Sequence, residues 1–435
     1  MEIITEHSDI YKTDKYNGPV VDGVMPDMLN PSFWVELYED SDKIIMTSDE
    51  IRQFNERNFK ALPFLFDFKV LPRMVEGEEV LKWINGLSTV PASARYDESG
   101  NRYQQKDYDK LKENLNKGKI AESMNVAYGF TVKRTQMRTW PSFKKSFPDA
   151  ASRRIDYFTE TAVYAAEPVQ IYHISADGHW YFARVYNYRG WIPAGDIALC
   201  PAEELEKYLN FSDFLVVKGP KIYIPESQDL RISGLQLDMG VKLRVLSESS
   251  EGYVVNFPVC DDNNGLRFVP ITIPFSEDVS RGFPDYTVKN VLIQAFRFLG
   301  EPYGWGGMNN AGDCSSFIED VYRSFGIILP RNSNQQEKLE GFVSFAGKGR
   351  MERLKILDSL KPGTPLYMPG HAMMYLGRFN GRYYIIHNVT TIYIKDADGA
   401  LTPAELNQVS VTPLDIYNSE GNEYIMMLTK AVPVE

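Results

Sequence analysis

Hydrophobic and polar residues alternate with different periods in successive parts of the chain. Near the N-terminus, the segments 48–59 (SDEIRQFNERNF) and 77–87 (GEEVLKWINGL) place apolar residues at the 3.6-residue spacing of amphipathic helices. Ser48 stands where the N-cap of the first helix is expected. The stretch 97–119 is polar throughout and is typical of a linker. The pattern therefore predicts a mainly helical segment over residues 1–118.

The period changes to two from about residue 122. Short alternating runs such as EPVQIYHIS and WYFARVYNY are separated by Gly, Pro, Asp and Asn, which is typical of a small β-barrel. A helical pattern at 201–211 interrupts these runs, and a second set of alternating segments follows it. We therefore predict two small barrels in tandem, at residues 122–200 and 205–278.

The last third of the chain combines both periods. Residues 285–300 form one apolar helix face that ends at Gly300, and a second amphipathic helix follows Cys314 and stops at Gly326. Three strand-like segments follow these helices. Helices followed by a meandering antiparallel sheet predict an α+β domain over 279–435, so the whole chain is expected to be a multidomain α+β protein.

Composition and charge narrow the possible partners. A chain of 435 residues is expected to form roughly two to four domains. Its net charge of −11 argues against nucleic acid as a partner, because phosphate contacts need clustered Lys and Arg. The three cysteines, Cys200, Cys260 and Cys314, are too far apart for a disulfide framework or a thiolate zinc site. We expect no metal or other cofactor.

The N-terminal sequence MEIITEHSDIYKTDK has no basic start and no apolar run, so it is not a secretory signal. No stretch approaches the length that spans a bilayer. The chain is expected to be a soluble monomer. It would be cytoplasmic if complete, and it would act in the cell envelope or outside the cell if a signal has been removed.

A possible catalytic group lies in the last domain. Cys314 precedes a helix, where backbone N–H groups and the helix dipole favour a thiolate, so its pKa is predicted to be lowered. His371 and His387 follow on consecutive predicted strands, in the order expected for a nucleophile, a base and an orienting group. The alternatives are a buried structural cysteine, a scaffold histidine, and a zinc site for which Asp313 is the only obvious further ligand.

The turn between the two histidines decides whether they meet. With a two-residue turn, Met374 would lie opposite His387, and the side chains of His371 and His387 would point to opposite faces. A three-residue loop with Gly381 in the left-handed conformation would place Met373 opposite His387, so that both imidazoles share one face. The sequence FNG suits the longer loop. The catalytic interpretation requires that loop or an equivalent bulge.

The segment GEPYGWGGMNNAGDCSSFIEDVYRSFGIILPRNSNQQ resembles the nucleophile motif of NlpC-type cysteine peptidases, which are bacterial cell-wall enzymes with a papain-like fold. LKPGTPLYMPGHAMMYLG is similar to the segment that bears their base, and the resemblance is strong over about 280–430. The two β modules resemble bacterial SH3-like domains. NPSFWVELYEDSDKIIMTSDEIRQFN resembles the helical N-terminal stabilising segment of a multidomain subgroup.

The resemblance implies a γ-D-glutamyl-L-diamino acid endopeptidase that cleaves peptidoglycan stem peptides. In this family Cys314 would be the nucleophile, His371 the general base, and His387 the polar orienting residue. The hydroxyl of Tyr303 would lie beside the thiolate and the oxyanion. The motif does not distinguish diaminopimelate from lysine as the diamino acid.

The resemblance also implies how the substrate is held. Asp313 and Ser315 would bind the free amine of an N-terminal L-Ala, Ser333 would line that pocket, and Trp305 would form a wall. Tyr188 of the first barrel would close the pocket beyond L-Ala, which limits cleavage to stem peptides released from the glycan. These peptides are the expected partners, as in murein peptide turnover or recycling.

Simpler roles are open for the same residues. Asp313 is equally placed to cap the helix, and Tyr188 could belong to the barrel core. Relatives can add an acid from the first barrel, for which Glu160 and Glu167 are candidates. Two alternative functions are a non-catalytic peptidoglycan-binding protein that uses its SH3-like domains, and an amidase or acyltransferase on the same fold.

Overall fold

The computed structural model describes residues 18, 20–396 and 398–435. By its internal contacts the chain divides into two units. Unit 1 comprises residues 1–63, 283–303 and 311–435, and unit 2 comprises residues 64–282 and 304–310. The predicted helical segment 1–118 is therefore divided at Pro63, and the short stretch 304–310 is grouped with the barrels. The N-terminal stretch considered as a signal lies outside the described residues.

Unit 1 is built on a six-stranded antiparallel sheet. The strands, in their order across the sheet, are β19 (Val343–Ser344), β24 (Lys430–Ala431), β20 (Pro365–Met368), β21 (His371–Phe379), β22 (Arg382–Lys395) and β23 (Leu401–Pro413). Two further short strands pair with each other, β1 (Ile44–Met46) and β18 (Tyr286–Thr287).

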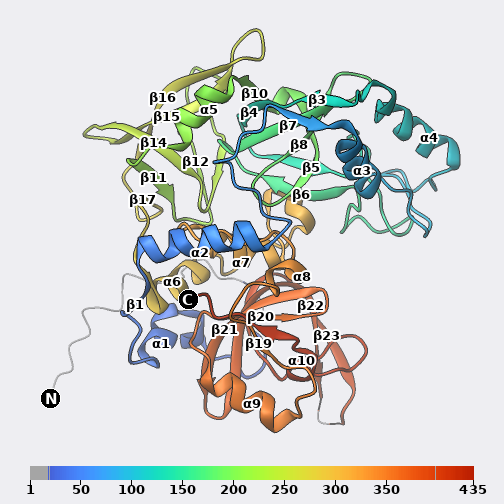
Figure 1. Cartoon of the computed structure of the whole chain (residues 1–435). Coiled ribbons are helices and arrows are strands. Elements are labelled where there is room, and N and C mark those ends of the chain that lie inside the picture. The colour runs from blue at the N-terminus through green and yellow to red at the C-terminus, as the bar shows by residue number, and fades with distance from the viewer. Residues whose placement is uncertain (1–17, 19, 397) are drawn as a thin grey trace. The chain divides into compact units, whose positions relative to one another are not determined.

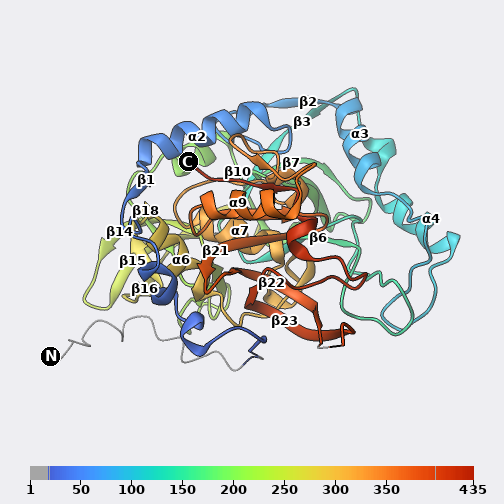
Figure 2. The ribbon, with the colours of Figure 1, turned by 90° about the horizontal axis from the view of Figure 1, so that it is seen from below.

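The helices of unit 1 are η1 (Pro26–Leu29), α1 (Pro31–Glu36), α2 (Ser48–Ala61), α6 (Val288–Arg297), α7 (Cys314–Arg323), α8 (Ser333–Gln336), α9 (Arg350–Ser359) and α10 (Tyr424–Met427). Helix α7 packs along β21 and β22 (Figure 2). Its apolar residues Phe317, Ile318 and Val321 are fully buried. The predicted stops at Gly300 and Gly326 are confirmed, because both glycines have the positive φ that ends a helix.

The N-terminal helices belong to unit 1. Trp34 of α1 is fully buried against Tyr384 of β22. The side chain of Asn55 of α2 donates to the carbonyl of Gly326 and accepts from the backbone of Ile328. The predicted N-cap of α2 at Ser48 is wrong: Thr47 caps the helix in a reciprocal capping box with Glu50, which leaves Ser48 as the first helical residue.

Unit 2 contains the two predicted small β modules. The first is a seven-stranded sheet with the strands, in spatial order, β10 (Ile197–Cys200), β4 (Ala127–Thr131), β7 (Pro168–Ile174), β8 (Trp180–Arg184), β9 (Arg189–Pro193), β5 (Thr135–Arg138) and β6 (Thr159–Val163). Helices α3 (Gly77–Leu87) and α4 (Gln105–Asn114) pack against its aromatic core (Figure 1). The segment predicted as a polar linker thus contains α4, whose Tyr108 and Leu111 are buried.

The second module follows helix α5 (Ala202–Leu209), the predicted helical connector. It is a five-stranded sheet made of β16 (Leu266–Pro274), β15 (Gly252–Cys260), β14 (Lys242–Glu248), β11 (Phe214–Val217) and β17 (Val279–Arg281). Two shorter pairs complete the unit: β12 (Lys221–Tyr223) with β13 (Gln236–Asp238), and β2 (Met74–Glu76) with β3 (Ser123–Asn125). In the part of the chain that the structure describes, no helix is both long enough and apolar enough to cross a membrane.

Candidate active site

Cys314 is the first residue of α7, as predicted from the sequence. The carboxylate of Asp313 caps the helix by accepting from the backbone N–H of Ser316. The side chain of Cys314 is largely buried, with 9% of the residue exposed. Its thiol is hydrogen-bonded by the backbone N–H groups of Ala372 and Ser315. The sulfur therefore lies beside the first residues of β21, in polar rather than purely apolar surroundings.

The predicted lowering of the thiol pKa is wrong for the unliganded protein. Burial raises the pKa of Cys314 to about 12, and the Asp313 carboxylate adds to the rise. The N–H bonds from Ala372 and Ser315 and the nearby Arg331 act in the opposite direction but do not outweigh burial. The resting sulfur is therefore a thiol, and it must lose its proton to become a nucleophile.

In the hairpin that carries the two histidines, a bulge sets the register that brings both imidazoles to one face of the sheet. The turn has two residues, Asn380 and Gly381, both with positive φ, so the predicted three-residue loop is wrong. However, the register shifts between Tyr375 and Gly377, and Met374 then pairs with Ile386. This irregularity moves Met373 opposite His387, which is the equivalent bulge that the catalytic interpretation required.

The two imidazoles are consequently in direct contact. His371 Nε2 and His387 Nδ1 are 2.8 Å apart, and His387 Nε2 is 3.1 Å from Thr412 Oγ1. If His371 is to accept a proton at Nδ1, its Nε2 carries hydrogen and donates to His387. His387 then carries hydrogen on Nε2 and donates to Thr412. This single set of tautomers satisfies every ring nitrogen of the two histidines except Nδ1 of His371.

Burial also keeps both histidines neutral. It lowers the pKa of His371 to about 4 and that of His387 well below its usual value, and the neighbouring His371 lowers the latter further. The ring of Tyr424, from α10, lies edge-on to both imidazoles with centroid distances of 6.2 and 6.3 Å. Above pH 6.5 both imidazoles are therefore neutral, and the Cys314 thiol is hydrogen-bonded by the backbone N–H of Ala372, the residue that follows His371.

Tyr303 lies in the same unit, immediately before the stretch 304–310. Its backbone N–H donates to the carbonyl of Asn407, and it forms an isolated bridge with Gly312. Burial raises the pKa of its phenol strongly, and the nearby Cys314 and Asp313 add to this rise. The hydroxyl is therefore protonated and able to donate a hydrogen bond close to the thiol.

A buried ion pair adjoins the nucleophile. Both oxygens of Asp313 accept from Arg331, at 3.0 and 2.6 Å, and Arg331 also donates to the hydroxyl of Ser315 at 2.8 Å. Asp313 therefore caps α7 and is also charge-balanced, so it is not an isolated carboxylate. Ser333 begins α8 and is half-buried. Gln336 of the same helix donates to the carbonyl of Ser315 at 3.0 Å.

The remaining predicted pocket residues belong to unit 2. The hydroxyl of Tyr188 donates to Glu160, and the second oxygen of that carboxylate accepts from Thr139 at 2.6 Å. Of the two acidic candidates in the first barrel, Glu160 is therefore the one bonded to Tyr188, while Glu167 is buried. Trp305 is 37% exposed. That Tyr188, Trp305 and an acidic residue of the first barrel bind substrate stays a prediction.

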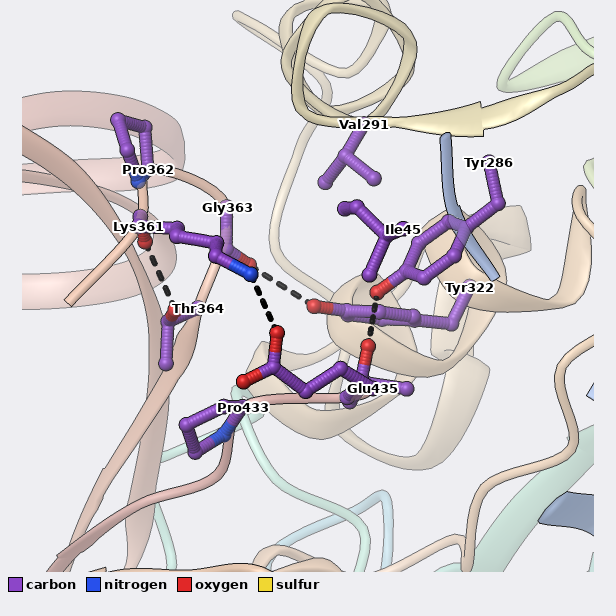
Figure 3. Close-up of a pocket in the computed structure, with 11 residues that line it drawn as sticks. Ile45, Tyr286, Val291, Tyr322, Lys361, Pro362, Gly363, Thr364, Pro433 and Glu435 are labelled. Atoms are coloured by element: carbon purple, nitrogen blue, oxygen red, sulfur yellow. Dashed lines mark hydrogen bonds and ion pairs between the residues drawn. The ribbon is translucent and has the colours of Figure 1, made fainter. Parts of the chain in front are cut away.

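Unit 1 also contains a small cavity that none of the predicted site residues line. Its lining includes Tyr286, Tyr322, Lys361 and Glu435 (Figure 3). Its volume is about 20 Å³, which is room for roughly one water molecule. The tyrosine hydroxyls donate to nearby backbone carbonyls, and Lys361 pairs with Glu435. Its size and its internally bonded polar groups make it a packing cavity rather than a peptide site.

Several residues of the site were not predicted from the sequence. Arg331 and Gln336 stood within the quoted motif, so their spacing from Cys314 could have drawn attention to them. Thr412 and Tyr424 had no such signal, because their positions depend on strand register and on the fold of the C-terminal segment. Within the described ranges, no three His, Cys, Asp or Glu side chains are grouped so that they could hold a metal ion.

Comparison with known proteins identifies two regions of the chain. Residues 300–410 match the NlpC/P60 family, and residues 141–193 match the SH3 domain of the SH3b1 type. A γ-D-glutamyl-L-lysine dipeptidyl-peptidase of Bacillus cereus is 31% identical over 158 residues, which cover 35% of this chain and 44% of that protein. The Bacillus subtilis protein of the same name is 30% identical over 110 residues, which cover 24% and 33%.

These matches span less than half the length of either relative. A solved structure described as a novel NlpC/P60 endopeptidase from Photobacterium damselae subsp. piscicida has a TM-score of 0.70, 20% identity, and coverage of 87% of this chain and 88% of that one. At this identity the likeness shows the fold, which is the predicted multidomain α+β architecture. The chain therefore contains an NlpC/P60 domain with an SH3 domain of the SH3b1 type ahead of it.

Proposed function

We propose that the protein is a cysteine endopeptidase that hydrolyses the bond between D-Glu and the diamino acid of peptidoglycan stem peptides. One observation carries the proposal: the Cys314 thiol is bonded to the backbone beside His371, and His371 heads a hydrogen-bonded series through His387 to Thr412. A thiol beside a neutral, oriented imidazole is suited to acyl transfer. The substrate class follows from the names of the curated relatives.

In the first half-reaction, Nδ1 of His371 takes the thiol proton while the sulfur attacks the γ-carbonyl carbon of D-Glu. The carbonyl oxygen becomes an oxyanion, which the backbone N–H of Cys314 and the phenol of Tyr303 would stabilise. His371 then returns the proton to the amino nitrogen of the diamino acid, and the C–N bond breaks. A thioester with Cys314 and a free amine remain.

In the second half-reaction, neutral His371 removes a proton from water, and the hydroxide attacks the thioester carbonyl. The tetrahedral intermediate collapses, the C–S bond breaks, and the proton held by His371 returns to the sulfur. The products are a free γ-carboxylate and the original thiol. His387 and Thr412 do not exchange protons with the substrate; they hold His371 in the tautomer that exposes Nδ1.

The finer proposal is that the substrate carries a free N-terminal L-Ala, as in turnover of peptides released from the glycan. Asp313 is already paired with Arg331, so an ammonium beside it would bring a second positive charge to one carboxylate. A second acid would offset that charge. Glu160, which is bonded to Tyr188 in the first barrel, is our candidate for this acid.

The central test is Cys314→Ala, with Cys260→Ala as the matched cysteine control in the second barrel. L-Ala-γ-D-Glu-diamino acid peptides, free and glycan-linked, are incubated with each protein and the products are identified by mass. Wild type and Cys260→Ala should release L-Ala-D-Glu, while Cys314→Ala should lose at least about 10⁴-fold in kcat. Near-normal turnover by Cys314→Ala would refute the proposal.

Amine recognition has its own test. Acetylating the L-Ala nitrogen removes its charge and should lower kcat/KM by about 10- to 100-fold, the effect of leaving buried acids without their partner. Glu160→Gln should reduce the rate for the free-amine peptide and narrow the difference between the two substrates. Equal rates for free and acetylated peptides would remove amine recognition while leaving the chemistry at Cys314 in place.

A further inference from the structure

The stretch 304–310, which carries Trp305, is bound closely to the first barrel within unit 2. Gly306 and Gly307 both have positive φ, at 56° and 83°. A Cβ atom on Gly306 would lie 2.9 Å from the Thr159 side chain, and one on Gly307 would lie 2.4 Å from Cβ of Ala162. Both glycines are therefore required by conformation and by the closeness of β6.

Two more contacts fix this loop. The buried Met308 accepts a hydrogen bond through its sulfur from the backbone N–H of Asp156, at 3.3 Å. The ring of Trp305 lies 6.2 Å from that of Tyr157, and both rings are more than a third exposed. The loop thus has buried anchors at 306–308 and presents its one large aromatic ring to solvent.

Arg134 reaches the loop from the turn between β4 and β5. Its Nη1 donates to the carbonyl of Gly307 at 3.0 Å and lies 3.4 Å from the amide oxygen of Asn310. Its Nε donates to Asp238 of the second module at 3.1 Å. The two charged side chains are only 7% and 8% exposed, so their hydrogen bonds are shielded from water.

We propose that Arg134 is a positioning residue for substrate binding: it holds the 304–310 loop so that Trp305 keeps one orientation, and Asp238 holds Arg134. The inference rests on the proposed function, because it takes Trp305 to contact the substrate. The second module then contributes to substrate binding through Asp238 and Arg134.

The physical reason is geometric. One guanidinium bonds two segments that are far from it and from each other in sequence, Asp238 through Nε and the 304–310 loop through Nη1 of its planar fork. Lysine has a single charged nitrogen and cannot reproduce this arrangement. Without the guanidinium, the carbonyl of Gly307 loses this hydrogen-bond donor, while the glycines and Met308 keep the loop near the barrel. The expected effect is on substrate binding more than on the chemical step.

The test measures kcat and KM for the tripeptide with Arg134→Met, Trp305→Ala and the double variant. Arg134→Met should raise KM about tenfold and change kcat by less than about twofold. Trp305→Ala should raise KM at least as much, and the double variant should be no worse than Trp305→Ala alone, because both changes act through one ring. Wild-type KM in Arg134→Met, or fully additive losses, would overturn the inference.

Arg281→Met is the matched control, since Arg281 also bonds two carboxylates, Asp213 and Glu248, on the surface of the second module. It should leave KM unchanged. Gly307→Ala displaces the loop, because its Cβ would lie 2.4 Å from Cβ of Ala162 and 3.1 Å from Nη2 of Arg134, and it should raise KM like Arg134→Met. This second variant keeps the test valid if Arg134→Met destabilises the barrels. A wild-type KM in Gly307→Ala would count against the inference.

Hydrogen exchange separates this inference from the proposed function. The backbone N–H of Gly307 bonds to the carbonyl of Gly304, so its exchange rate reports on the loop. Arg134→Met should exchange faster over 304–310, and Arg281→Met should not. Unchanged exchange in Arg134→Met would overturn the positioning role even if the peptide is cleaved. A wild-type KM in Trp305→Ala would overturn the link to substrate while the chemistry at Cys314 stands.

Discussion

Two of the buried arginine–aspartate pairs, Arg331–Asp313 in unit 1 and Arg134–Asp238 in unit 2, have different tasks. Arg331 binds both oxygens of Asp313 and the hydroxyl of Ser315, the residues on either side of the nucleophile. Arg134 donates from Nε to Asp238 and from Nη1 to the carbonyl of Gly307 in the 304–310 loop. The first pair lies within one motif, whereas the second joins segments more than 100 residues apart.

The difference shows how a buried charge can serve a site in two ways. The Arg331 pair adjoins the sulfur, and each partner changes the pKa of Cys314 in the opposite direction. Its loss should therefore affect the chemical step. The Arg134 pair bonds backbone that carries an exposed aromatic ring, so its loss should affect binding. Kinetic constants can separate the two roles, because kcat and KM respond to different interactions.

Arg331→Met should cause the largest change among the variants that test this comparison. It leaves Asp313 buried without its cation, which should cost about 3–5 kcal/mol in the free energy of unfolding. The unbalanced carboxylate should also raise the pKa of the Cys314 thiol further and reduce kcat by about 100-fold or more. Urea unfolding and single-turnover kinetics measure the two effects.

The double variant Arg331→Met/Asp313→Leu distinguishes charge balance from general damage. Removing both charges should recover much of the lost stability, since an apolar pair of similar volume can replace a buried ion pair. Activity should stay low, because the cap of α7 is gone together with the carboxylate that we propose binds the amine. A kcat for Arg331→Met within twofold of wild type would show that this pair is structural only.

A smaller effect on kcat is expected for the hydrogen bond between Thr412 and His387, because both groups are neutral. Thr412→Val removes the hydroxyl that pairs with His387 but keeps the shape of the side chain. The reduction in kcat should be about 5- to 10-fold, as expected for one lost hydrogen bond, and KM should not change. Thr412→Ser should restore the rate. If serine and valine behave alike, the hydroxyl does not orient His387.

The smallest effect is the pH dependence of stability, which arises from the imidazoles. His371 has a pKa of about 4 in the folded protein and about 6.5 when unfolded, so the unfolded state binds more protons between these values. Its contribution to stability is full above pH 6.5 and is lost as pH falls towards 4. His371→Gln should reduce the acid-induced drop in Tm between pH 7 and 4.5 by a few degrees. An identical drop in both proteins would contradict the assigned shift.

Local patterns in the sequence were enough to predict much of the fold. The two β modules, the helix that begins at Cys314 and the hairpin of His371 and His387 follow from periodicity and from glycine stops. The cap at Thr47 and helix α4 were missed for two different reasons. At the start of α2, Thr47 and Ser48 are adjacent and either residue type can cap a helix, so the sequence did not distinguish them. Helix α4 has few apolar residues, and these are buried against a barrel that lies later in the sequence.

The site could be predicted from the sequence only where its residues belong to recognisable motifs. The grouping of Cys314, His371 and His387 could be predicted from order and spacing, but the contact between the two histidines depends on a bulge at Leu376 that no turn signal revealed. The thiol pKa was predicted in the wrong direction because the helix dipole is local, whereas burial depends on the whole domain. Thr412 could not be found for the same reason, since its contact with His387 is set by strand register.

The most direct test of the account is to observe the thioester. L-Ala-γ-D-Glu-diamino acid peptide is mixed with the wild-type protein, the reaction is acid-quenched within one turnover, and the intact protein is weighed. The account predicts an added L-Ala-γ-D-Glu acyl group, located on the peptide that contains Cys314 and absent from Cys314→Ala. Product release at the full rate by Cys314→Ala, or an acyl group attached elsewhere, would contradict it.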